Sequence, residues 1–352
     1  MEGIPTMPTP GLESRARRRT LFTNETYQQA RAALLGPSTS AAPIPRPTTH
    51  QERLEADVWR EICWPSEIFA HPLGITCVRP GATLDVEVES AAAATILLRS
   101  LLPAKLVGED DGAAEGVAGL RVQVTDRALA LSRPGGAVVR LTGLERGTFE
   151  AVLEQYHRYL NDNGLEAVVA EAGRQVPARP SHGPQEHPAA ESAGPGARAA
   201  MDALASALLR RSALFHTTTT SYYVTVWQAG GLEEWHCELF YAPGSDAGDL
   251  LVEALRDPLF GVGSSGRSER DERFYDKDGR ERARRVSFEP AATPGAGLQL
   301  RLRHSPASEA VGPYRQYARG PMAVAEDRLR ALFPTLAGHD SGRSAVERSK
   351  ER

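Results

Sequence analysis

Hydrophobic positions along the chain recur with two different periods, and their order predicts two folded modules. In the first stretch, Leu54, Val58 and Ile62 recur at helical spacing. Residues 83–89 then alternate between aliphatic and acidic side chains, as expected of a strand with one buried face. The same reasoning predicts helices and strands at 52–62, 75–79, 83–89, 90–102, 119–125, 128–133 and 137–141, and a final helix that ends at Asn163 and Gly164.

A second stretch repeats this order. Met201, Leu204 and Leu208 lie on one helical stripe near residues 198–214. Strands at 222–229 and 233–242 are predicted to form a hairpin in which Trp227 and Trp235 pair across the strands. The remaining elements are predicted at 246–255, 271–275, 282–289, 297–304 and 321–333. We therefore predict an α+β fold of two tandem modules with similar α-β-β-α-β-β-β-α order and mainly antiparallel sheets, a layout that a structural duplication would explain.

Proline-rich and small polar residues separate and flank these stretches. Residues 173–197 contain five prolines and no apolar periodicity, which is typical of a linker. The domain prediction is a disordered basic arm with one short helix at 1–50, the first module at 51–164, the linker at 165–197, the second module at 198–335 and a disordered tail at 336–352.

Composition and charge narrow the functional classes. The net charge of −4 gives no overall attraction to nucleic acid or to an anionic membrane, so any such contact requires a local patch. Of the 41 basic residues only Lys105, Lys277 and Lys350 are lysines, a bias that GC-rich coding explains more simply than selection for planar charge. Three scattered cysteines, no secretory signal and no apolar run of membrane length predict a cytoplasmic protein that does not span a membrane.

Motifs for catalysis, cofactors and metals do not occur in a convincing context. The glycine pattern Gly261-Val-Gly263-Ser-Ser-Gly266 follows a predicted helix, whereas a dinucleotide site needs a strand before it and a helix after it. The spacing of Cys63, His71 and Cys77 matches no standard zinc site. We therefore expect no cofactor and no metal, and a non-enzymatic protein is favoured over an enzyme.

Charged sheet faces are the first candidate binding surfaces. On the predicted strand 297–304 the leucines point one way, which places Arg301 and Arg303 on the outer face, and Arg285 joins them if the neighbouring strand pairs in register. The corresponding face of the first module carries the acidic residues Asp85, Glu87 and Glu89. Faces of opposite charge could meet between two copies of the chain, so a homo-oligomer is one possible outcome. Exposed ion pairs contribute only about 0–1 kcal/mol each.

The N-terminal arm is the second candidate. Arg17, Arg18 and Arg19 precede a short predicted helix, an arrangement that commonly becomes ordered on nucleic acid or on a protein partner. A solubilising tail explains these residues equally well.

These features favour a cytoplasmic binding or adaptor protein that acts in a protein or protein–nucleic acid assembly. The predicted binding residues are Arg17, Arg18, Arg19, Arg285, Arg301 and Arg303. One alternative is an enzyme whose site lies in a cleft between the modules, lined by His236, Glu238 or Arg301. Another is a nucleic-acid-binding protein that uses its arginine-rich arm and loop in a salt-sensitive manner.

Overall fold

A computed structural model describes most of the two predicted modules. The described residues are 11–36, 42–62, 71–108, 114–168, 178–179, 195–218, 221–228, 234–241, 247–266, 269–279, 281–291 and 293–304. The predicted helix at 321–333, the tail at 336–352 and most of the linker lie outside this range. Within the described part, none of the helices combines the length and the apolar character that crossing a bilayer would require.

The first half of the chain contains two N-terminal helices and the elements of the first module. These are α1 (Leu12–Thr23), α2 (Tyr27–Leu35), α3 (Thr49–Ile62), η1 (Pro72–Gly74), β1 (Ile75–Pro80), β2 (Leu84–Val88), α4 (Ala91–Leu101), β5 (Arg121–Val124), β6 (Leu129–Ser132), β7 (Val138–Thr142) and α5 (Arg146–Asp162). At the start of α4, the Ser90 hydroxyl accepts a hydrogen bond from the backbone N–H of Ala93, as an N-cap does. The predicted elements from residue 52 to residue 163 are thus confirmed, with small shifts at their ends.

The second half repeats the layout. Its elements are α6 (Pro195–Leu209), α7 (Leu214–Thr217), β10 (Ser221–Gln228), β11 (Glu234–Tyr241), α8 (Ala247–Arg256), β12 (Arg270–Tyr275), β13 (Glu281–Phe288) and β14 (Gly297–His304). The helix predicted at 198–214 is divided, because a turn separates α6 from α7. The glycine pattern at 261–266 connects α8 to β12, so it lies between a helix and a strand.

Both halves build a five-stranded sheet with the same topology. The strand orders are β1-β2-β7-β6-β5 and β10-β11-β14-β13-β12. In each sheet the second strand pairs in parallel with the last one, and the other three pairings are antiparallel. The predicted α+β class with mainly antiparallel sheets is therefore confirmed, and the two halves share strand order as well as element order.

A small additional sheet was not anticipated from the sequence. It consists of β3 (Ala104–Leu106), β4 (Ala114–Glu115), β8 (Leu165–Ala167) and β9 (Ala178–Arg179), in the order β8-β3-β4-β9. Strands of two or three residues are too short to display an alternating pattern. Two of them, β8 and β9, fall inside the segment that the sequence predicted as a linker.

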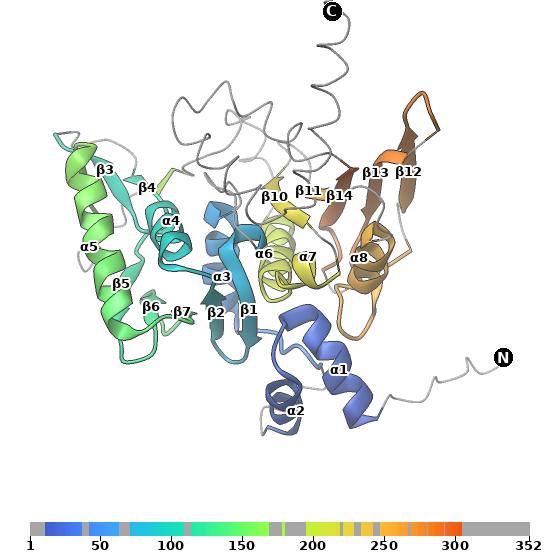
Figure 1. Cartoon of the computed structure of the whole chain (residues 1–352), viewed down its shortest axis with the longest axis horizontal. Coiled ribbons are helices and arrows are strands. Elements are labelled where there is room, and N and C mark those ends of the chain that lie inside the picture. Colours follow the sequence, from blue (N-terminus) through green and yellow to red (C-terminus); the bar gives the residue numbers. More distant parts are fainter. Residues whose placement is uncertain are drawn as a thin grey trace, which may run out of the picture.

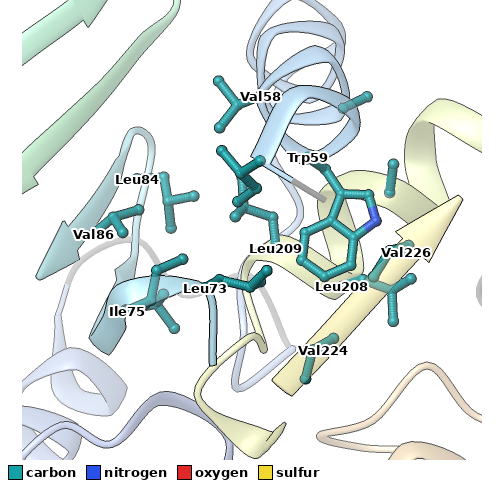
Figure 2. Close-up of a cluster of buried hydrophobic side chains, with 14 of the residues drawn as sticks. Val58, Trp59, Leu73, Ile75, Leu84, Val86, Leu208, Leu209, Val224 and Val226 are labelled. Atoms are coloured by element: carbon teal, nitrogen blue, oxygen red, sulfur yellow. The ribbon is translucent and has the colours of Figure 1, made fainter. Parts of the chain in front are cut away.

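The first helices of the two modules pack against each other between the sheets. Figure 1 shows α3 and α6 in the middle, with the first sheet on one side and the second sheet on the other. The ring of Trp59 on α3 stacks on Phe215 of α7, with centroids 6.2 Å apart. Figure 2 shows how Val86 of the first sheet and Val226 of the second line the same apolar cluster as Trp59. A single hydrophobic core therefore runs through both halves.

A buried ion pair lies within this helix contact. Glu55 of α3 and Arg210, which directly follows α6, are 0% and 1% exposed, and two N–O distances of 2.7 Å join them. The Ser206 hydroxyl donates to the same carboxylate at 2.6 Å. Nη1 of Arg210 donates at 2.9 Å to the carbonyl oxygens of Pro45 and Gly81. Since each charge finds several partners, the desolvation cost of burying both is offset.

The N-terminal helices are docked on this junction. Residues 12–20 form most of α1, where the sequence predicted the disordered part of an arm. Phe22 of α1 stacks on Phe260 of the second half, with centroids 5.7 Å apart, and α1 also contacts β1 of the first half. Arg19 is 1% exposed, pairs with Glu25 at 2.6 Å and donates to the carbonyl of Pro80 at the end of β1. The helix thus connects the two modules.

Candidate binding surface

Alternation along β13 and β14 brings three of the predicted arginines to the outer face of the second sheet. Leu298, Leu300 and Leu302 are fully buried in the core, so the residues between them point outward. Arg285 of β13 lies directly opposite Arg301 of β14. Arg303 follows two residues later on the same face, so the three guanidinium groups are neighbours, as the sequence pattern predicted.

Two of these arginines are neutralised by neighbouring strands. Arg285 pairs with Glu272 of β12 at 3.3 Å, and its guanidinium lies over the ring of Phe274 at 5.4 Å. Arg303 pairs with Glu238 of β11 and lies near the ring of Phe240. Both pairs are largely solvent-exposed on the arginine side, so each contributes little to stability.

Arg301, between them, has different surroundings. No carboxylate of the described residues lies within 4.0 Å of its guanidinium. Its Nε donates to the Gln299 side chain at 2.8 Å, and the guanidinium lies 5.2 Å from the centroid of the Trp227 ring. Partial burial lowers the pKa of Arg301, attraction to the nearby Glu238 opposes this shift, and repulsion from Arg285 and Arg303 adds to it. An arginine stays protonated in proteins, so this position carries a positive charge without an ion-pair partner in the described part of the chain.

His236 supports Arg301 from the neighbouring strand. Its Nδ1 lies 3.3 Å from Nη2 of Arg301 and its Nε2 lies 3.0 Å from the Glu234 carboxylate. Arginine only donates, so Nδ1 accepts and Nε2 carries the proton that is donated to Glu234. Both ring nitrogens are therefore occupied, which leaves neither free to act as a general base in this arrangement.

His236 is buried although it lies on the outer face of the sheet. Its side chain is 6% exposed, because β10 places Trp227 directly opposite it with ring centroids 5.3 Å apart. The same register places Gln228 opposite Trp235, so the predicted pairing of the two tryptophans is wrong. Trp235 points into the core and its indole N–H donates to the Met201 carbonyl at 3.0 Å.

The three residues named for an enzyme in the inter-module cleft do not line the junction. His236, Glu238 and Arg301 all lie on the outer face of the second sheet, whereas α6 and the first half pack on its inner face. Within the described ranges, no group of three His, Cys, Asp or Glu side chains is placed to hold a metal ion.

The three arginines of the N-terminal arm lie on α1 and point in different directions. Arg17 and Arg18 are exposed on α1, and Arg18 pairs with Asp257 of the second half. Arg19 points inward to Glu25 and to backbone carbonyls, so it is not available to an external phosphate. Ala16, Arg19 and Phe22 recur at helical spacing and form the buried face of α1. The sequence does not show that Arg19 is buried, because that depends on the distant residues with which it pairs.

The outer face of the first sheet is not acidic, contrary to the sequence prediction. Asp85 pairs with Arg140 of β7 at 2.6 Å, and Glu87 pairs with Arg79 of β1. Glu89 accepts from the backbone N–H of His71 at 2.8 Å and lies 3.1 Å from its ring. The neighbouring strands supply cations that reading one strand at a time does not reveal. The predicted opposition of charge between the two faces is therefore wrong.

A scan against protein-family models, a search of curated proteins and a search of solved structures each found no match to this chain. A functional conclusion must therefore come from the chemistry of its own surfaces. The outer face centred on Arg301, Trp227 and His236 is the strongest of these. We call these three residues the Arg301 cluster.

Proposed function

We propose that this protein is a non-enzymatic binding or adaptor protein of a cytoplasmic assembly, and that it holds an acidic segment of a protein partner on the Arg301 cluster. The observation that carries the proposal is the charge of Arg301, which is half-buried, flanked by two arginines and without a carboxylate partner among the described residues. A partner carboxylate would supply that missing charge through a charge-assisted, bidentate hydrogen bond.

The surroundings of Arg301 suit a protein ligand. Trp227 is half-buried beside it and offers apolar area, and tryptophan and arginine are the residues that dominate binding energy at protein interfaces. Gln299 and His236 orient the guanidinium before binding, which reduces the entropic cost of forming the contact.

A cytoplasmic location agrees with the state of two cysteines. Cys77 and Cys237 are both buried and unpaired thiols. Thiols kept in this form are typical of a reducing compartment.

The decisive experiment is quantitative affinity capture with full-length protein, Arg301→Glu and Arg121→Glu. Arg121 is an exposed arginine at the edge of the first sheet, so its substitution changes net charge equally. We expect recovery of a protein partner to fall about tenfold or more with Arg301→Glu, since loss of one hot-spot contact costs at least 1.4 kcal/mol. Recovery with Arg121→Glu should equal that of the wild type.

Two results would contradict the proposal. Equal loss with both variants would indicate only a general effect of charge. Loss of all captured proteins after nuclease treatment would assign the contact to nucleic acid instead. Thermal unfolding of each variant should be measured alongside, to exclude a folding defect.

A further inference from the structure

The two halves differ at the far edge of their sheets. In the first half, α5 lies along α4 and β5 and buries four side chains: Phe149, Val152, Tyr156 and Leu160. Val122 and Val124 of β5 are partly buried and pack against the same core. Figure 1 shows α5 running the length of this edge. The edge of the first sheet is thus closed by the helix that follows its last strand.

The matching edge of the second half is open in the described part of the chain. Every residue of β12 is exposed, including Tyr275 at 60%. Leu250 on the adjacent α8 is 54% exposed. An ion pair of 3.2 Å between Asp249 of α8 and Arg273 of β12 brings the two elements together. We call the surface formed by Leu250, Tyr275 and this ion pair the α8–β12 edge.

The sequence after β14 contains a segment with the apolar pattern of α5. The buried residues of α5 recur at intervals of three, four and four positions. Residues 321–333 show the same intervals: Met322, Ala325, Leu329 and Phe333. Residues 305–320 separate the segment from β14 and can span roughly 50 Å when extended, so the chain can reach the edge.

We infer that the α8–β12 edge is the docking site of residues 321–333 of this same chain, bound as a helix in the place that α5 occupies in the first half. Three observations carry the inference: the shared strand order, the exposed apolar side chains at the edge that the described residues leave open, and the matching pattern in the segment that follows β14. Burial of that stripe supplies the apolar area that a single short helix needs in order to be stable.

The test is hydrogen–deuterium exchange on the purified full-length chain with Leu329→Asp and with Ala331→Asp. Residue 331 lies on the opposite side of the helix from the stripe, so it is a matched control. We expect amides of α8 and β12 to exchange about tenfold faster with Leu329→Asp, since local opening energies set exchange rates. With Ala331→Asp they should exchange as in the wild type.

The reciprocal variant tests the same contact from the other side. Leu250→Asp should accelerate exchange within 321–333, whereas Val107→Asp, at a 63% exposed position of the first half, should not. Free exchange of 321–333 in the wild type would overturn the inference. So would protection that depends on protein concentration, because it would assign the edge to a second copy of the chain.

Discussion

The two sheets of this protein have one topology and two different surfaces. On the first sheet, Asp85 and Glu87 each face an arginine of a neighbouring strand, so the outer charges are balanced within the sheet. On the second, Arg285 and Arg303 are balanced in the same way, whereas Arg301 between them has no carboxylate partner among the described residues. Strand order thus determines which residues share a face, while the pairing of charges within that face determines whether it is inert or available to a partner.

The halves also differ in how they are completed. The first sheet is closed at its far edge by α5, and the second shows an exposed edge strand over the described residues. At the junction, in contrast, the buried ion pair between Glu55 and Arg210 joins the two halves. The following predictions test how far the halves are equivalent, from the largest expected effect to the smallest.

Breaking the junction pair should have the largest effect. Replacing Glu55 with alanine leaves the guanidinium of Arg210 buried without its carboxylate, which costs about 3–5 kcal/mol of unfolding free energy. Urea unfolding followed by circular dichroism measures this loss. Arg146→Ala is the control, because the ion pairs of Arg146 with Asp126 and Glu150 are solvent-exposed and contribute little to stability. A loss below 1 kcal/mol with Glu55→Ala would show that the pair does not hold the halves together.

Acidification should have the next largest effect on stability, through a pair of histidines that come one before the first strand of each sheet. His71 precedes β1 and His216 precedes β10, and their rings meet edge to face at 4.9 Å. Burial, with repulsion from His71, lowers the pKa of His216 to about 4, while Glu89 opposes the shift. The folded state therefore disfavours the proton that the unfolded chain accepts near pH 6.5. The contribution is fully present above that pH and is lost as the pH falls toward 4, a change of about 3 kcal/mol.

Urea unfolding at pH 7.5 and pH 5 measures this dependence. His216→Asn should remove part of the difference between the two pH values, because asparagine does not titrate. His157→Asn, which replaces an exposed histidine of α5, should leave the difference unchanged. If both variants keep the full dependence on pH, the junction histidine does not couple protonation to folding.

The smallest expected effects come from one substitution on the outer face of each sheet. Arg140→Met removes the partner of Asp85 and should cost up to about 1 kcal/mol. Within the described part of the chain, Arg301→Met removes no ion pair, and the loss of attraction to Glu238 is offset by relief of repulsion from two arginines, so it should change stability by less than about 0.5 kcal/mol. Urea unfolding of both variants gives the comparison. A larger cost for Arg301→Met would mean that this charge is already satisfied within the fold.

The element order and the fold class could be predicted from the sequence because local patterns report which face of an element is buried. Alternation at Leu298, Leu300 and Leu302 was sufficient to orient Arg301 and Arg303, and Ser90 was sufficient to begin α4. Two-residue strands such as β4 and β9 carry no such pattern. The helix α1 was missed because its buried stripe includes Arg19.

Only the tertiary structure determined which residues distant in sequence contact each other. Apolar periodicity determined that α3 and α6 each have a buried face, but not that Glu55 and Arg210 meet there. The sequence placed Asp85 on an outer face, yet only strand order showed that Arg140 lies beside it. The physical reason is that burial of apolar area is additive along one element, whereas a charge or hydrogen bond depends on a specific partner at a specific distance.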